Sequence, residues 1–83
     1  MSFNKWLDVF IEEKELAIGH AFEFEDGNGY NLMPLEVVIE YLKNQSNDIK
    51  NKVKSKIVEI DFLNGNVMNF FEYVAKGIPK FIN

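Results

Sequence analysis

The side chains of this 83-residue chain with the clearest capacity for chemistry are its carboxylates and lysines. The sequence contains thirteen Asp and Glu residues and nine Lys residues. A buried carboxylate can act as a general acid, and several carboxylates together can bind calcium. The chain has no cysteine, so neither a thiolate metal site nor a disulfide framework is available. Its one histidine, His20, has no partner at a spacing that suggests a metal site or a catalytic dyad. We interpret it as a hydrogen-bonded residue at the edge of a hairpin.

The acids gather in the first half of the chain. Residues 1–42 hold nine acids and two lysines, a net charge of −7, whereas residues 43–83 hold four acids and seven lysines, a net charge of +3. Several acids lie among Phe and Trp residues and form a predicted acidic face: Glu12, Glu13, Glu15, Glu23, Glu25 and Asp26. Such a face could imitate the charge of DNA and be steered toward a basic nucleic-acid channel.

The same acids do not have the pattern of a catalytic or metal site. A catalytic carboxylate needs partial burial, and these residues fall on the polar sides of their elements. Asp26–Gly29 departs from the EF-hand pattern because glycine comes too early and no terminal glutamate follows at the expected position. Gly27 and Gly29 do not belong to a phosphate-binding loop. We therefore expect no enzymatic activity, no metal and no cofactor.

The one basic cluster consists of Lys50, Lys52, Lys54 and Lys56. It could contact nucleic-acid phosphates, an acidic protein or the acidic half of a second copy. Binding to nucleic acid is disfavoured because the chain is acidic and contains no arginine, which removes bidentate contacts to guanine and phosphate. A solvated lysine face is the simplest interpretation.

Apolar periodicity predicts the elements that carry these residues. Residues 3–16 have the three- and four-residue spacing of an amphipathic helix, which Ser2 can cap. Residues 20–26 alternate, with Phe22 and Phe24 on one side, as a half-buried strand does. Asp26–Gly29 can form the turn to a second strand over residues 30–33, which completes a β-hairpin.

Three further helices follow in this interpretation. Pro34 suits the first turn of a helix whose apolar stripe ends at Leu42. The next helix, which Ser46 or Asn47 can cap, has a stripe from Ile49 to Ile60. Residues 57–62 also alternate as a strand would, but Asn64–Gly65 favours a helix that stops there. Asn66 can cap a last helix that ends at Gly77, and Phe81 and Ile82 of the tail are expected to pack on the core.

These elements predict one α+β domain over residues 1–83, with three to four helices and one short β-hairpin between the first and second helix. No run approaches the roughly 20 apolar residues that span a bilayer, and the first residues lack the apolar stretch of a signal peptide. We therefore expect a cytoplasmic protein with no membrane partner.

Residues 60–76, together with residues 10–14 and 31–38, resemble a family of short uncharacterised bacterial proteins that are carried on plasmids and phages. The resemblance implies a mobile-element setting, in which small acidic proteins commonly inhibit host defence, as anti-CRISPR and anti-restriction proteins do. It brings no catalytic residue to this chain.

The predicted function is non-enzymatic binding of another protein, with inhibition of a host-defence nuclease through the acidic, aromatic-rich face as its specific form. Two alternatives stay open at this point. One is a nucleic-acid-associated accessory factor that uses the Lys50–Lys56 face. The other is a small structural or adaptor homodimer in which the acidic and basic halves of two copies meet.

Overall fold

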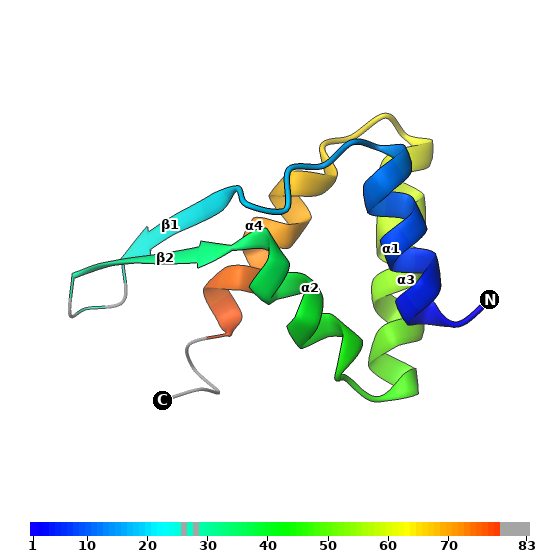
Figure 1. Ribbon diagram of the computed structural model, residues 1–83, viewed down its shortest axis with the longest axis horizontal. Coiled ribbons are helices and arrows are strands. Elements are labelled where there is room, and N and C mark those ends of the chain that lie inside the picture. Colours follow the sequence, from blue (N-terminus) through cyan, green and yellow to red (C-terminus); the bar gives the residue numbers. More distant parts are fainter. Residues whose placement is uncertain (26, 28, 79–83) are drawn as a thin grey trace.

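The computed structural model describes residues 1–25, 27 and 29–78, and these form four helices and one β-hairpin (Figure 1). The elements in chain order are α1 (Phe3–Glu13), β1 (Ala21–Glu25), β2 (Tyr30–Pro34), α2 (Leu35–Lys43), α3 (Asn47–Phe62) and α4 (Val67–Gly77). The strands pair antiparallel, with Ala21 opposite Pro34 and Glu25 opposite Tyr30. The predicted α+β fold, with the hairpin between the first and second helix, is confirmed.

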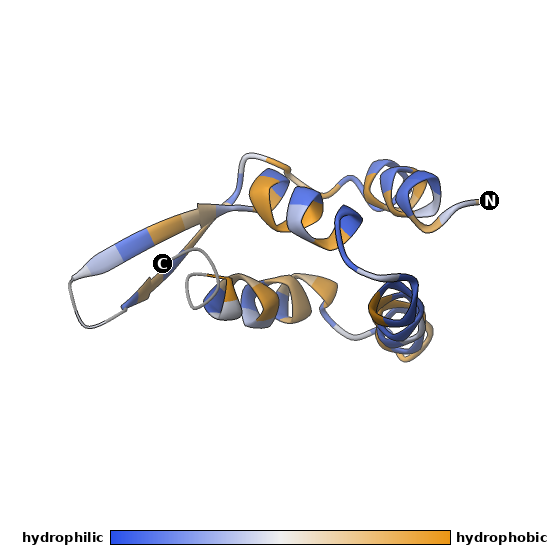
Figure 2. Cartoon of the chain, turned by 90° about the horizontal axis from the view of Figure 1, so that it is seen from below, coloured by the Kyte–Doolittle hydropathy of each residue, from blue (hydrophilic) through white to orange (hydrophobic). Residues whose placement is uncertain are grey.

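The helices are arranged in two layers. α1 and α2 form one layer, which lies on a second layer made of α3 and α4 (Figures 1 and 2). α1 packs on α3 and α2 packs on α4, while neighbouring helices within each layer also touch. The hairpin extends from the α2–α4 end of the molecule, and α4 contacts its β1 strand. The long axis of 39 Å therefore runs from the hairpin to the α1–α3 pair.

The hydrophobic core lies between the two layers and continues under the hairpin. It takes the apolar stripe of each element and, within the described residues, buries no polar or charged side chain. Figure 2 shows the consequence, since orange segments of α2 and α4 face each other while α3 is largely hydrophilic. The core residues are Leu7, Phe10, Ile11, Phe22, Phe24, Met33, Leu35, Val38, Ile39, Leu42, Ile57, Val67, Phe71, Ala75 and Ile78.

Side chains start three of the helices where the sequence predicts caps. Ser2, Ser46 and Asn66 each accept a hydrogen bond from a backbone N–H of the first helical turn. Two helices end in the same way, with a residue in the left-handed region: Glu15 after α1 at φ 53° and Asn64 after α3 at φ 57°. The helical part of the first segment is thus shorter than the predicted helix to residue 16.

One other boundary differs from expectation, and one open alternative is resolved. Pro34 is the last residue of β2 and the N-cap of α2, one position before the first turn, because its ψ of 147° is extended. The helix favoured for residues 57–62 is confirmed and the strand alternative is wrong, since α3 continues to Phe62 and buries Ile57 completely. The expected packing of Phe81 and Ile82 lies outside the described residues. Within the described part of the chain, no helix has the length and apolar character that crossing a membrane requires.

Candidate functional site

A groove with an apolar floor and an acidic rim opens between α1, α2 and the turn that follows α1. Its cavity has a volume of about 500 Å³. Four aliphatic side chains form the floor, and six charged side chains form the rim. We call this the acidic groove; its floor is Ile11, Leu16, Ile18 and Ile39, and its rim is Asp8, Glu12, Glu15, Glu36, Glu40 and Lys43.

Backbone hydrogen bonds fix the turn at one end of the groove. The Leu16 N–H donates to the Ile11 carbonyl at 3.0 Å, which closes the end of α1. The Glu36 N–H donates to the Ile18 carbonyl at 2.9 Å, and the Leu35 N–H donates to the His20 carbonyl at 2.8 Å. The turn is thereby tied to the start of α2. Ile18 is held at the groove with 51% of its surface exposed.

The rim carries five carboxylates and one lysine. Asp8 and Glu12 lie one helical turn apart on α1, and Glu36 and Glu40 lie one turn apart on α2. Like charges at this spacing destabilise a helix by about 0.2–0.5 kcal/mol per pair. The rim therefore concentrates negative charge, although Glu36 lies in the first turn of α2, where the helix dipole favours a carboxylate.

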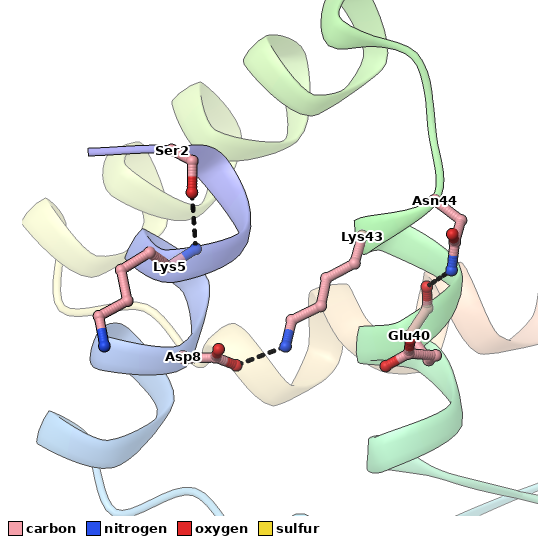
Figure 3. Close-up of polar contacts among 6 residues, drawn as sticks. All are labelled: Ser2, Lys5, Asp8, Glu40, Lys43 and Asn44. Atoms are coloured by element: carbon pink, nitrogen blue, oxygen red, sulfur yellow. Dashed lines mark hydrogen bonds and ion pairs between the residues drawn. The ribbon is translucent and has the colours of Figure 1, made fainter.

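Lys43 is the only cation on the rim. Its Nζ reaches from α2 across to Asp8 Oδ1 on α1 at 2.6 Å (Figure 3). The Lys43 side chain is 20% exposed and that of Asp8 is 55% exposed, so the pair sits near the surface. Among the described residues, none of the other four rim carboxylates takes part in an ion pair.

Two rim residues occupy positions that lower the stability of the fold. Glu12 is in the last turn of α1, close to the negative end of the helix dipole. Glu15 has the left-handed backbone conformation that favours glycine. Local rules are most often broken at functional positions, and here two exceptions line the same groove.

The groove contains only part of the predicted acidic face. Glu12 and Glu15 line it, and the structure brings them together with Asp8, Glu36 and Glu40, which sequence reasoning missed. A signal for the missed residues was present, because both helices carry acids one turn apart on either side of an apolar residue. What the spacing could not show is that the two helices lie next to each other.

The other predicted acids lie elsewhere. Glu13 is exposed but does not line the groove. Glu23 and Glu25 lie on the exposed side of β1, opposite Leu32 and Tyr30, at the far end of the long axis from α1 (Figure 1). Asp26 lies outside the described residues.

The predicted lysine face is not one face. Lys50 and Lys54 are directed toward α1, where their Nζ atoms lie 5.9 Å from the Phe3 ring centroid and 5.4 Å from that of Trp6. Residues two apart on a helix differ by about 200° in direction. Lys52 and Lys56 therefore point away from the side of α3 that carries Lys50 and Lys54. The single-face interpretation was therefore wrong, for a reason of helix geometry.

Lys52 and Lys56 remain on the outer side of α3. They line a shallow depression of about 350 Å³ with Asn51, Ser55 and Glu59. The carboxylate of Glu59 reduces the positive charge of this surface. Two exposed lysines beside a glutamate form a weak basic patch.

His20 and the remaining polar groups form no metal centre in the part of the chain that the structure describes. The His20 ring packs edge-on against Phe22, with centroids 4.9 Å apart. No group of three or more His, Asp or Glu side chains among the described residues is arranged to hold a metal ion.

Comparison with known proteins gave no match: no family model, no curated protein and no solved structure matches this chain. The resemblance to short plasmid- and phage-borne proteins therefore stays a prediction.

Proposed function

We propose that this chain is a non-enzymatic protein-binding protein that holds a basic part of another protein at the acidic groove. The observation that supports this is the combination of five rim carboxylates with an apolar floor. Two of those carboxylates, Glu12 and Glu15, occupy positions that disfavour the fold. A partner with basic residues would offset the repulsion along the rim and cover the floor.

The partner class that we propose is a host-defence nuclease, which the chain would inhibit. Nucleases that hold DNA or RNA present basic channels, and an acidic surface is attracted to such a channel over long range. The mobile-element setting implied by the resemblance agrees with this role. Binding to nucleic acid has less support, because Lys50 and Lys54 are occupied by the aromatic rings of α1.

The test compares two double charge reversals in bacteria that carry a restriction or CRISPR effector. The measured quantity is the efficiency with which a targeted plasmid transforms the cells. Glu12→Lys with Glu40→Lys changes the groove rim from a net charge of −4 to 0. Both positions lie toward the C-terminal ends of their helices, where a lysine is favourable, so this variant is expected to fold.

The matched control is Glu23→Lys with Glu25→Lys on the hairpin, which makes the same change in net charge away from the groove. We expect the wild-type chain and the hairpin variant to raise transformation and the groove variant to lose this effect. Purified effector should likewise bind the first two proteins and not the third. The proposal would be contradicted if the two variants gave the same transformation efficiency. It would also be contradicted if the wild-type chain raised transformation against no class of effector.

A further inference from the structure

The floor of the acidic groove leaves apolar surface for a ligand to cover. Ile18 is 51% exposed at one end of the groove, next to Ile11 and Ile39, which belong to the core. Because the Ile18 carbonyl accepts a hydrogen bond from the Glu36 N–H, this side chain is presented on a fixed backbone. An apolar side chain that enters here would extend the core outward.

The rim restricts the charge of that ligand. Carboxylates line both sides of the floor, with Asp8, Glu12 and Glu15 on the α1 side and Glu36 and Glu40 on the α2 side. An acidic segment would be repelled from both sides. A segment that carries cations on either side of an apolar residue could place the apolar residue on the floor and its cations beside the rim carboxylates.

Lys43 already supplies one such cation from within the chain. Its Nζ bonds Asp8 Oδ1 across the groove, and exposed ion pairs of this kind are weak enough to be exchanged. A ligand cation would compete with Lys43 for Asp8. Lys43 thus takes the place that one basic residue of the ligand would occupy.

From these three observations we infer that the acidic groove binds a lysine- or arginine-bearing amphipathic segment of a protein partner, with Lys43 as a built-in competitor. This inference rests on the proposed function and specifies its ligand. The helix-in-groove mode fits a floor with a helix on either side, with apolar anchors inward and cations along the edges.

The test uses a short helical peptide of leucine and lysine as the probe, and measures binding to the full chain by fluorescence anisotropy. A second peptide keeps every lysine and replaces each leucine by serine. We expect the leucine-containing peptide to bind at least about tenfold more tightly, the ratio that about 1.4 kcal/mol of apolar burial provides. Equal affinity of the two peptides would overturn the inference, because charge alone would then account for binding.

Two matched pairs of variants locate the contact. Ile18→Asp should weaken binding of the leucine–lysine peptide, whereas Val58→Asp should not, although Val58 on α3 has a similar exposure of 48% against 51%. Lys43→Gln should strengthen binding by about two- to fivefold, the range that an exposed ion pair provides. Lys76→Gln should leave it unchanged, since the Lys76–Glu72 pair lies on α4, outside the groove.

Each outcome separates this inference from the broader proposal. If Ile18→Asp does not change peptide binding, or Lys43→Gln weakens it, the inferred ligand mode is wrong. The broader proposal can still hold when this happens. If the Glu12→Lys and Glu40→Lys variant no longer binds the nuclease, the acidic surface keeps its proposed function without an apolar anchor.

Discussion

At the scale of single residues, Glu15 has a side chain that lines the groove and a backbone conformation that favours glycine. It follows α1 with φ 53°, and the Leu16 N–H bonds back to the Ile11 carbonyl, so the chain turns as it does at a helix end that normally uses glycine. A side chain in this conformation costs about 1–2 kcal/mol. The carboxylate lies on the groove rim, where the proposed ligand would use it.

We therefore predict that Glu15→Gly raises the free energy of unfolding by about 0.5–1 kcal/mol, after the greater freedom of glycine in the unfolded chain is subtracted. Glu15→Gln keeps the backbone strain and removes only the charge, so it should show much less of this gain. Urea unfolding of the two variants checks the difference. Both should bind the basic peptide less tightly, and equal stability of the two would show that the backbone at Glu15 is not strained.

Gly65 is a position where the absence of a side chain is needed for packing and not for a positive φ. A Cβ built on it would lie 3.0 Å from Ile60 Cγ2 and 3.2 Å from the Ile60 carbonyl oxygen. The Gly65 N–H donates to that same carbonyl at 2.8 Å, which closes the end of α3 and holds the two groups close.

Gly65→Ala should therefore lower the free energy of unfolding by about 1–3 kcal/mol, the usual range for overpacking. Gly19→Ala is the control, since a Cβ at Gly19 would meet no atom within 4 Å. Thermal unfolding followed by circular dichroism compares the two. A loss in the Gly19 variant as large as that in the Gly65 variant would contradict the packing argument.

At the scale of elements, α1 and α3 are joined by contacts between a row of aromatic rings on α1 and two lysines on α3. Phe3, Trp6 and Phe10 follow one another along α1 with centroids 5.9 and 5.5 Å apart. Lys50 and Lys54 of α3 lie over the first two rings. Among its described side chains α3 buries only Ile57 fully, and these contacts join the Lys14–Asp61 ion pair in attaching α3 to α1.

Lys54→Gln should consequently cost about 0.5–1 kcal/mol of stability, the value of a cation–π contact. Lys52→Gln is the control on the same helix, because Lys52 faces solvent and contacts no ring among the described residues. Trp6 is the only tryptophan, so its fluorescence reports on this contact directly. The emission should change with Lys54→Gln and not with Lys52→Gln. A change with Lys52→Gln alone would contradict the contact between Lys54 and Trp6.

The elements themselves were largely predictable, and their contacts were not. Apolar spacing, the caps Ser2, Ser46 and Asn66 and the alternation around Phe22 identify four helices and the hairpin, because these signals are local in sequence. The acidic groove needs α1 beside α2, which periodicity does not specify. The division of the lysines on α3 was available from helix geometry, since alternate residues point to opposite sides.

At the scale of the whole molecule, charge is separated between the layers. The acidic groove lies in the layer of α1 and α2. Lys52 and Lys56 lie on α3 in the other layer, about 200° around the helix from the lysines that face α1. The basic patch is thus directed away from the layer that carries the groove, and one copy cannot neutralise its own acidic groove with these lysines.

This arrangement predicts how two copies would associate. We expect the groove of one copy to meet the Lys52–Lys56 patch of another, a head-to-tail contact that leaves a free groove and a free patch at the ends. The contact depends on exposed charges, so salt should weaken it. We expect sedimentation velocity to show concentration-dependent association at low salt and monomers at physiological salt, and Lys52→Glu with Lys56→Glu should abolish the low-salt association. A discrete dimer that persists in salt and in this variant would contradict this prediction, and also the adaptor dimer of acidic and basic halves, because its interface would then use a different surface from the two charged ones.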